Sequence, residues 1–194
     1  ETKFLSSCRA LVEPGQILFT QSEGVRQSRR GSLRLLLAGV DLSEAPDLAG
    51  LLTEYNVSPD GQSARSQLAV IDDNPYYVRD YAKCVMCWRC VDVCGDEVQL
   101  TYAIEPGERG FHVRISTSEY DGIMDTTCVY CGNCVQVCPS GALKSRTQWE
   151  LEQDGFVRDD RVVQTTCSFC GVGCGLDVHV RNGQITHAMS PENH

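Results

Sequence analysis

The sequence predicts an α+β fold whose core is organised by metal sites more than by a large apolar interior. Twelve of the 194 residues are cysteines, and eleven of these fall into three regularly spaced groups. Helical and β-type patterns are both present, but each is short, and the apolar residues are scattered in small clusters. We therefore expect the metal sites to supply much of the organisation of the core.

A cysteine motif occurs twice in the middle of the chain, with the second copy 44 positions after the first. Both copies read C-x2-C-x2-C-x3-C, which is the known spacing of bacterial two-cluster ferredoxins. In those proteins the fourth cysteine of each copy binds the cluster of the other copy. The first predicted [4Fe–4S] cluster is therefore held by Cys84, Cys87, Cys90 and Cys138. The second is held by Cys94, Cys128, Cys131 and Cys134.

Zinc knuckles and disulfides are the alternatives for these eight cysteines. Zinc sites usually use two Cys-x2-Cys pairs set well apart, and not two three-cysteine runs with a trailing fourth. Disulfides need an exporting context, and the sequence shows no secretory signal. The spacing therefore favours iron–sulfur clusters.

Two helices are predicted before the cysteine motifs. Residues 23–38 show helical periodicity after Ser22, a good N-cap residue, and Gly39 is a suitable stop. A second, shorter helix is predicted from Pro46, with Ser43 as its cap.

Several short β-strands are predicted from alternating apolar residues. They are a strand at 68–71, a hairpin of 98–104 with 111–116, and a hairpin of 176–180 with 184–188. The sequence Arg-Asn-Gly at 181–183 is typical of a type I′ turn. Residues 140–143 are expected to turn and to pack on the second cluster.

A third cysteine group, Cys167, Cys170 and Cys174, has the spacing C-x2-C-x3-C. Three thiolates leave a cluster one ligand short. His187 is a candidate for the fourth ligand, but a histidine on a hairpin is more often an ordinary surface residue. The glycines at 171–175 do not form a dinucleotide-binding motif, because no strand is expected before them and no helix after them.

Residues 166–176, Thr-Cys-Ser-Phe-Cys-Gly-Val-Gly-Cys-Gly-Leu, resemble the opening of the molybdopterin oxidoreductase domain. They are most similar to the catalytic (alpha) subunits of formate dehydrogenases. The resemblance implies that Cys167, Cys170 and Cys174 bind a third [4Fe–4S] cluster, whose fourth ligand lies beyond His194. It also implies a molybdenum or tungsten bis-pterin site outside this chain, so that no catalytic residue is expected within it.

The resemblance extends toward the N-terminus. Residues 74–84 and 94–99 resemble the dicluster segment of NAD-linked formate dehydrogenases and of iron hydrogenases. Residues 7–9 with 13–15 resemble the tail of a [2Fe–2S] domain, which implies that Cys8 is the fourth ligand of a [2Fe–2S] cluster. Many relatives carry a further cluster with one histidine and three cysteines. Residues 39–60 contain neither residue type, so we expect that cluster to be absent.

The resemblance implies five segments, in which a ferredoxin-like 2[4Fe–4S] domain is flanked by parts of two other domains. They are the remnant of a [2Fe–2S] domain (1–23), a helical connector (24–74), the 2[4Fe–4S] domain (75–146), a linker (147–160) and the start of a molybdopterin oxidoreductase [4Fe–4S] domain (161–194). Because the chain begins without Met and ends within a motif, we expect a fragment of a longer cytoplasmic protein.

The net charge of −9 makes nucleic acid a poor partner and favours docking to a basic patch on another redox protein. No apolar run approaches the ~20 residues of a membrane span. We expect an electron relay between a molybdopterin site and a flavin- and NAD-binding partner of a formate dehydrogenase. The alternatives are the large subunit of a complex-I-like NADH–quinone oxidoreductase, an iron hydrogenase, and a stand-alone polyferredoxin.

Overall fold

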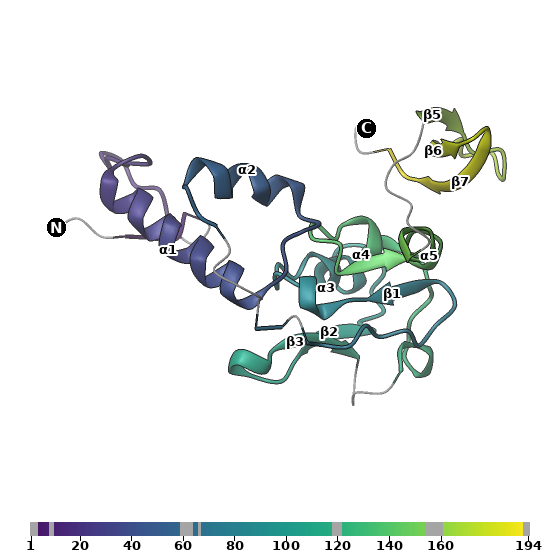
Figure 1. Cartoon of the computed structure of the whole chain (residues 1–194), viewed down its shortest axis with the longest axis horizontal. Coiled ribbons are helices and arrows are strands. Elements are labelled where there is room, and N and C mark those ends of the chain that lie inside the picture. Colours follow the sequence, from purple (N-terminus) through teal and green to yellow (C-terminus); the bar gives the residue numbers. More distant parts are fainter. Residues whose placement is uncertain are drawn as a thin grey trace.

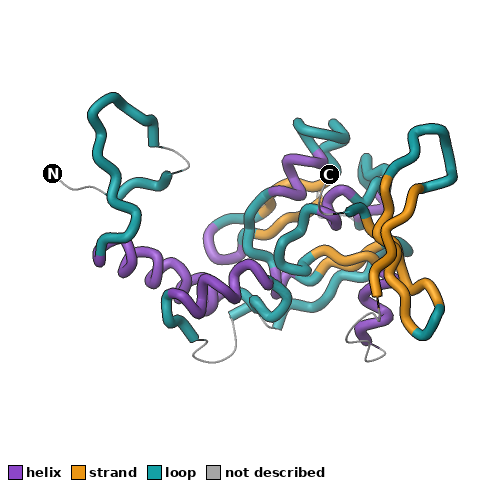
Figure 2. Tube along the Cα trace, turned by 90° about the horizontal axis from the view of Figure 1, so that it is seen from above, coloured by secondary structure: helices purple, strands orange, loops and turns teal. Residues whose placement is uncertain are grey.

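The computed structural model describes residues 4–7, 10–58, 64–65, 67–117, 122–153 and 161–191. Two helices at the N-terminal side lead into a central unit of short strands and helices, and a separate three-stranded sheet follows near the C-terminus (Figure 1). The same three parts follow one another in the view from above (Figure 2). Helices and short strands are both present, as the α+β prediction requires.

The N-terminal helices are α1 (Glu23–Gly39) and α2 (Pro46–Glu54). The Ser22 side chain accepts a hydrogen bond from the Val25 N–H at 3.4 Å, so the predicted N-cap of α1 is present. The predicted cap of α2 is wrong, because Ala45 occupies the N-cap position and makes no side-chain bond. The two helices share a small core of Leu33, Tyr55 and Val57, packed by Leu37 and Leu52.

The central unit contains two small antiparallel sheets and several short helices. Strand β1 (Tyr77–Arg79) pairs with β4 (Leu143–Ser145), and β2 (Ile104–Gly107) pairs with β3 (Arg114–Thr117). The helices are α3 (Arg89–Cys94), α4 (Asn133–Gln136), η1 (Tyr81–Lys83), η2 (Gly110–His112) and η4 (Ile123–Asp125). The buried core consists of Tyr77, Tyr81, Cys84, Ile104, Ile115, Ile123 and Ala142. Five further cysteines pack against it, namely Cys90, Cys94, Cys128, Cys134 and Cys138.

Two predictions for this unit need correction. The expected strand at 68–71 is reduced to an isolated bridge between Ile71 and Arg79. The first strand of the predicted hairpin starts at Ile104 and not at residue 98, because the preceding segment winds back onto the end of α3. There the Thr101 and Tyr102 N–H groups both donate to the Cys94 carbonyl, at 3.0 and 3.2 Å.

The C-terminal part begins with helix α5 (Arg146–Gln153), where the sequence predicts only a polar linker. A three-stranded antiparallel sheet follows, in the order β5 (Arg161–Thr166), β6 (Gly175–Arg181) and β7 (Gln184–Met189). The predicted turn between β6 and β7 is confirmed, because Asn182 and Gly183 both have positive φ, 49° and 76°. Strand β5 is not among the predicted strands, and all six of its residues are exposed.

None of the helices in the described parts of the chain combines the length and the apolar character that crossing a membrane requires.

Candidate metal centres

Two pockets in the central unit are each lined by four cysteines. The Cys84 pocket contains Cys84, Cys87, Cys90 and Cys138. The Cys128 pocket contains Cys94, Cys128, Cys131 and Cys134. The free space in and around them, which is partly open to solvent, is about 360 and 370 Å³ respectively, so the two pockets are alike in size. Each pocket therefore takes three cysteines from one motif and one from the other.

The two cysteine loops repeat in backbone conformation as well as in sequence. Met86 and Tyr130, which are equivalent in the two motifs, have the same positive φ of 55°. Trp88 and Gly132, also equivalent, have φ of 66° and 77° and form the N-caps of α3 and α4. Left-handed residues in such loops turn successive N–H groups toward one side, where these groups can bind a negatively charged group.

Backbone N–H groups point at the cysteine sulfurs in both loops. The Tyr130 N–H donates to the Cys128 sulfur at 3.4 Å. The Met86 N–H makes the equivalent bond to Cys84, where it lowers a thiol pKa that burial raises. These bonds stabilise a thiolate, the form in which cysteine binds metals. The loops thus have the polarity that iron–sulfur ligation needs.

Short helices explain why the motifs exchange their fourth cysteines. Cys90 and Cys94 both lie on α3, four residues apart, which is about 6 Å along the helix axis. Cys90 lines the Cys84 pocket, and Cys94 lines the Cys128 pocket. Cys134 lies on α4 and lines the Cys128 pocket. Cys138, two residues after the end of α4, lines the Cys84 pocket, and its N–H donates to the Val135 carbonyl at 3.2 Å. Each helix, with the residues that follow it, therefore leads from one pocket to the other.

Burial and the neighbouring thiolates disfavour free thiolates in both pockets. Burial, with the charges of nearby cysteines, raises the pKa of Cys90 to about 12. The same causes raise the pKa of Cys134 to about 12. Without a metal, the Cys90 and Cys134 thiols stay protonated at neutral pH, and metal binding must release those protons. The positive charge of an iron core would offset the negative charge of these buried thiolates.

Hydroxyl groups also contact the cysteine sulfurs, mainly in the Cys128 pocket. The Tyr77 hydroxyl lies 3.4 Å from the Cys128 sulfur, and the Thr101 hydroxyl lies 3.4 Å from the Cys94 sulfur. In the Cys84 pocket the corresponding contact, between Ser140 and Cys138, is longer at 4.0 Å. Burial and the bond to Cys128 raise the pKa of Tyr77 above its ordinary value. Sequence patterns carry no signal for the Tyr77 contact, because it joins residues of different segments.

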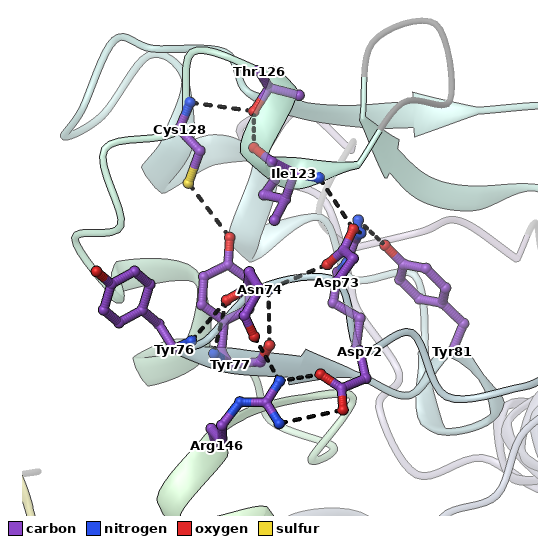
Figure 3. Close-up of polar contacts among 11 residues, drawn as sticks. Asp72, Asp73, Asn74, Tyr76, Tyr77, Tyr81, Ile123, Thr126, Cys128 and Arg146 are labelled. Carbon is purple, nitrogen blue, oxygen red and sulfur yellow. Dashed lines mark hydrogen bonds and ion pairs between the residues drawn. The ribbon is translucent and has the colours of Figure 1, made fainter.

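The turn Asp72–Asn74 fixes β1 beside the Cys128 pocket (Figure 3). The Asn74 side-chain oxygen accepts the N–H groups of Tyr76 and Tyr77, both at 3.0 Å, and its amide donates to the Tyr77 carbonyl at 2.9 Å. The Asp73 carboxylate pairs with the buried Arg79. Asp72 pairs with Arg146, the first residue of α5. This turn thus connects β1 to the start of the C-terminal part.

Glu44 links the helical connector to the central unit. Its carboxylate pairs with Lys83 at 3.1 Å and with Lys144 of β4. Lys144 is buried and also pairs with Glu152 of α5. The segment after α1 also contacts η1, just before the first cysteine loop, since the Asp41 N–H donates to the Ala82 carbonyl at 2.9 Å. These contacts hold the connector against the Cys84 side of the unit.

Residues 140–143 lie away from the second cluster site, on which the sequence predicts them to pack. Ser140, Ala142 and Leu143 line the Cys84 pocket instead. The reason is the exchange of cysteines between the motifs, because Cys138 lines that pocket and the chain after it continues along the same wall. The segment therefore packs against the pocket of the first motif and not against that of its own.

The remaining predicted ligands differ from the eight cysteines above. Cys170 and Cys174 are exposed and Cys167 is half-buried, and the Cys167 N–H donates to the Cys174 carbonyl at 2.7 Å. His187, the alternative fourth ligand, stacks on His179 across β6 and β7 with a centroid distance of 4.1 Å. Cys8 lies outside the described residues. Over the described ranges, no group of three or more His, Cys, Asp or Glu side chains lies close enough together to hold a single metal ion.

Two family descriptions match separate parts of the chain. Residues 83–142 match the 4Fe-4S dicluster domain. Residues 160–194 match the molybdopterin oxidoreductase Fe4S4 domain. The chain thus contains both kinds of iron–sulfur segment, in the predicted order. Neither match covers half of the chain, and the [2Fe–2S] tail stays a prediction.

Relatives over nearly the whole chain are oxidoreductases of more than one kind. NADH-quinone oxidoreductase subunit 3 of Thermus thermophilus is 27% identical over 99% of this chain and 26% of its own length. A protein of Staphylococcus haemolyticus, provisionally named a formate dehydrogenase, is 24% identical over 94% of this chain and 23% of its own length. The chain therefore spans about a quarter of the length of these two relatives.

A solved structure supports the fold. The crystal structure of an NAD+-reducing [NiFe]-hydrogenase in the H2-reduced state matches 73% of this chain and 64% of that chain. The TM-score is 0.62, and the sequences are 23% identical. At this identity the likeness is evidence for the fold alone.

Proposed function

We propose that this chain is an electron relay of a formate dehydrogenase and that it binds two [4Fe–4S] clusters, one in each pocket. Cys84, Cys87, Cys90 and Cys138 would bind the first cluster. Cys94, Cys128, Cys131 and Cys134 would bind the second. The observation that carries the proposal is the exchange of the fourth cysteine between motifs, which gives each pocket four thiols around a hollow of similar size.

Clusters bound there would supply one-electron transfer, and the chain would hold them close together and shielded from water. A single turn of α3, about 6 Å, separates the ligands Cys90 and Cys94 of the two sites. Buried side chains cover much of both pockets, while Cys87 and Cys131 are exposed. Each site therefore has one ligand at the surface, which is a suitable point for electrons to enter or leave.

The proposed reaction is the oxidation of formate, or its reverse, at a molybdopterin site outside this chain. The match of residues 160–194 to the molybdopterin oxidoreductase Fe4S4 domain supports this, with Cys167, Cys170 and Cys174 as ligands of a third cluster. The relative from Staphylococcus haemolyticus also supports it. A flavin- and NAD-binding subunit would exchange electrons with the relay, and the acidic chain favours a basic docking surface on it.

A second candidate is the large iron–sulfur subunit of a complex-I-like NADH–quinone oxidoreductase. The relative from Thermus thermophilus favours it, because the similarity covers 99% of this chain. Against it stands the absence of His and Cys from residues 39–60, where we expect many such relatives to bind a further cluster.

Iron content tests the cluster assignment. The 194-residue chain, reconstituted anaerobically, should bind about eight irons at the two motifs and give EPR signals of reduced [4Fe–4S] clusters. Stoichiometric zinc without an EPR signal on reduction would contradict the proposal.

Activity of the full-length protein, expressed from its gene, tests the reaction. We expect formate to reduce a viologen dye in the presence of this protein. Quinone reduction by NADH, without activity toward formate, would instead support the second candidate.

A further inference from the structure

We propose that the Tyr77 hydroxyl sets the reduction potential of the cluster in the Cys128 pocket by donating a hydrogen bond to the Cys128 sulfur. This inference rests on the proposed function, since it requires a cluster at that site. It makes Tyr77 a positioning residue that acts through a ligand and does not itself bind iron. The contact distance between the hydroxyl oxygen and the sulfur is 3.4 Å.

The direction of the hydrogen bond follows from the chemistry of the ligand. A metal-bound cysteine is a thiolate and carries no proton, so the tyrosine must be the donor. Reduction adds negative charge to the cluster and its sulfurs, and a hydrogen bond to a more negative acceptor is stronger. The bond therefore favours the reduced state, and its removal should lower the potential.

Both partners of this bond are anchored to the same turn (Figure 3). On one side, Asn74 bonds the backbone of Tyr77 in both directions. On the other side, Asp73 accepts the Ile123 N–H at 3.1 Å. The Ile123 carbonyl accepts the Thr126 hydroxyl at 2.7 Å, and that hydroxyl accepts the Cys128 N–H at 3.2 Å. The distance between hydroxyl and sulfur is therefore fixed by a continuous set of hydrogen bonds.

The surroundings of Tyr77 leave its hydroxyl no competing role among the described contacts. The side chain belongs to the buried core and is 4% exposed. The Cys84 pocket also contains a buried tyrosine, Tyr81, but its hydroxyl contacts Arg79 at 3.5 Å and not a sulfur. In that pocket a positive charge lies near the cysteine backbone instead, since the Arg65 guanidinium donates to the Cys84 carbonyl at 3.4 Å. The two clusters would thus be tuned by different groups.

The test compares Tyr77→Phe with Tyr130→Phe in the 194-residue chain. Both changes remove one hydroxyl and keep an aromatic ring that lines the Cys128 pocket. Tyr130, however, reaches Cys128 through its backbone N–H, which phenylalanine retains. Each reconstituted protein is titrated with dithionite at controlled potentials, and cluster reduction is followed by EPR. Iron content is measured first in every sample.

We expect one of the two reduction steps to move to lower potential in Tyr77→Phe while the other stays in place. The bond is present in both redox states, so the shift measures only the difference in its strength between them and should be at most about 59 mV, which is a tenfold change in a one-electron equilibrium. Tyr130→Phe should leave both steps unchanged. By ENDOR, one proton signal that is lost on exchange into D2O should be present in the reduced wild type and missing in Tyr77→Phe, while the signals of the backbone N–H groups bonded to the sulfurs remain.

Three outcomes would overturn the inference. If both steps stay unchanged in Tyr77→Phe although about eight irons are bound, the inference fails and the proposed function stands. Equal shifts in both tyrosine variants would assign the effect to general packing of the pocket. A wild-type chain without reducible clusters would overturn the proposed function, and the inference with it.

Discussion

The central unit and the C-terminal sheet present cysteines in opposite ways. In the central unit, eight cysteines line two pockets, and six of them belong to or pack against the buried core. In the C-terminal part, Cys170 and Cys174 are exposed, and the neighbouring Phe169 is 93% exposed. The contrast indicates that the first set forms pockets from this chain alone, while the third set presents its cysteines outward.

The difference has a physical origin in the surrounding elements. In the central unit, α3 carries one cysteine of each pocket, and α4 carries Cys134 and leads to Cys138. Each motif therefore helps to bury the cysteines of the other. The third group lies between β5 and β6, where one backbone bond joins its ends and no second motif faces it among the described residues. Two interleaved motifs can bury each other's cysteines, whereas a single loop cannot bury its own.

The largest expected effect follows from removing one of the two cysteines that the motifs exchange. Cys138→Ala should abolish the cluster of the Cys84 pocket and leave the other, so the iron content should fall from about eight to about four per chain. The reason is that Cys138 lines the Cys84 pocket although it belongs to the second motif. Iron analysis and EPR of the reconstituted protein measure this.

Cys174→Ala is the matched change in the C-terminal part and should leave those eight irons in place. Loss of the Cys128-pocket cluster in Cys138→Ala would show that the ligands are not exchanged. Loss of iron from the central sites in Cys174→Ala would remove the contrast between the two regions.

The next largest effect concerns the anchor of β1. Asp73→Asn leaves Arg79 without its carboxylate, and the Arg79 side chain is only 5% exposed. An uncompensated buried charge costs about 3 kcal/mol, so we expect the unfolding midpoint in guanidinium to fall clearly. The loss of cluster absorbance with denaturant gives the midpoint.

Asp72→Asn is the control for this change. Asp72 pairs with Arg146 at the surface, and its side chain is 46% exposed. Exposed ion pairs contribute little, so this variant should lose much less stability than Asp73→Asn. Equal losses would mean that the turn acts as one unit, without a special role for the Asp73–Arg79 pair.

The same carboxylate predicts a dependence on pH. Burial raises the pKa of Asp73, but hydrogen bonds from Ile123 and Asn74, together with Arg79, outweigh burial and hold it below the ordinary 3.8. A lowered pKa stabilises the folded state above the unfolded value, and this contribution is lost as the pH falls through the folded pKa. The difference in guanidinium denaturation midpoint between wild type and Asp73→Asn, followed by circular dichroism, should thus be constant near neutral pH and shrink below 3.8. A constant difference down to lower pH would contradict this.

The grouping of the cysteines is predictable from the sequence because that information is local and periodic. Spacing within each motif and its repetition lead to the assignment that the two pockets support. The same holds for α1 and for the Asn182–Gly183 turn, where capping and turn residues act over a few positions.

The features that sequence patterns do not predict depend on contacts between distant segments. Tyr77 and Cys128 are 51 positions apart, and Asp72 and Arg146 are 74 apart. Strand β5 is polar at its ends and fully exposed, so it lacks the alternation that signals a strand, and it exists because β6 supplies its hydrogen bonds. The predicted place of residues 140–143 is wrong for a similar reason, since their neighbours come from the other motif.

The smallest expected effect tests the equivalence of the two cysteine loops. Gly132 has φ of 77° and open space where a Cβ would lie, so Gly132→Ala adds no clash and only the cost of a left-handed residue, about 1 kcal/mol. The first motif already tolerates Trp88 at this position with φ of 66°. The variant should therefore keep both clusters while its denaturation midpoint falls slightly. Gly31→Ala, also in open space but within helix α1, should raise stability by about 1 kcal/mol because alanine favours the helix. Loss of iron in Gly132→Ala would mean that the second loop needs glycine for cluster binding itself, and that the two motifs are alike in sequence but not in function.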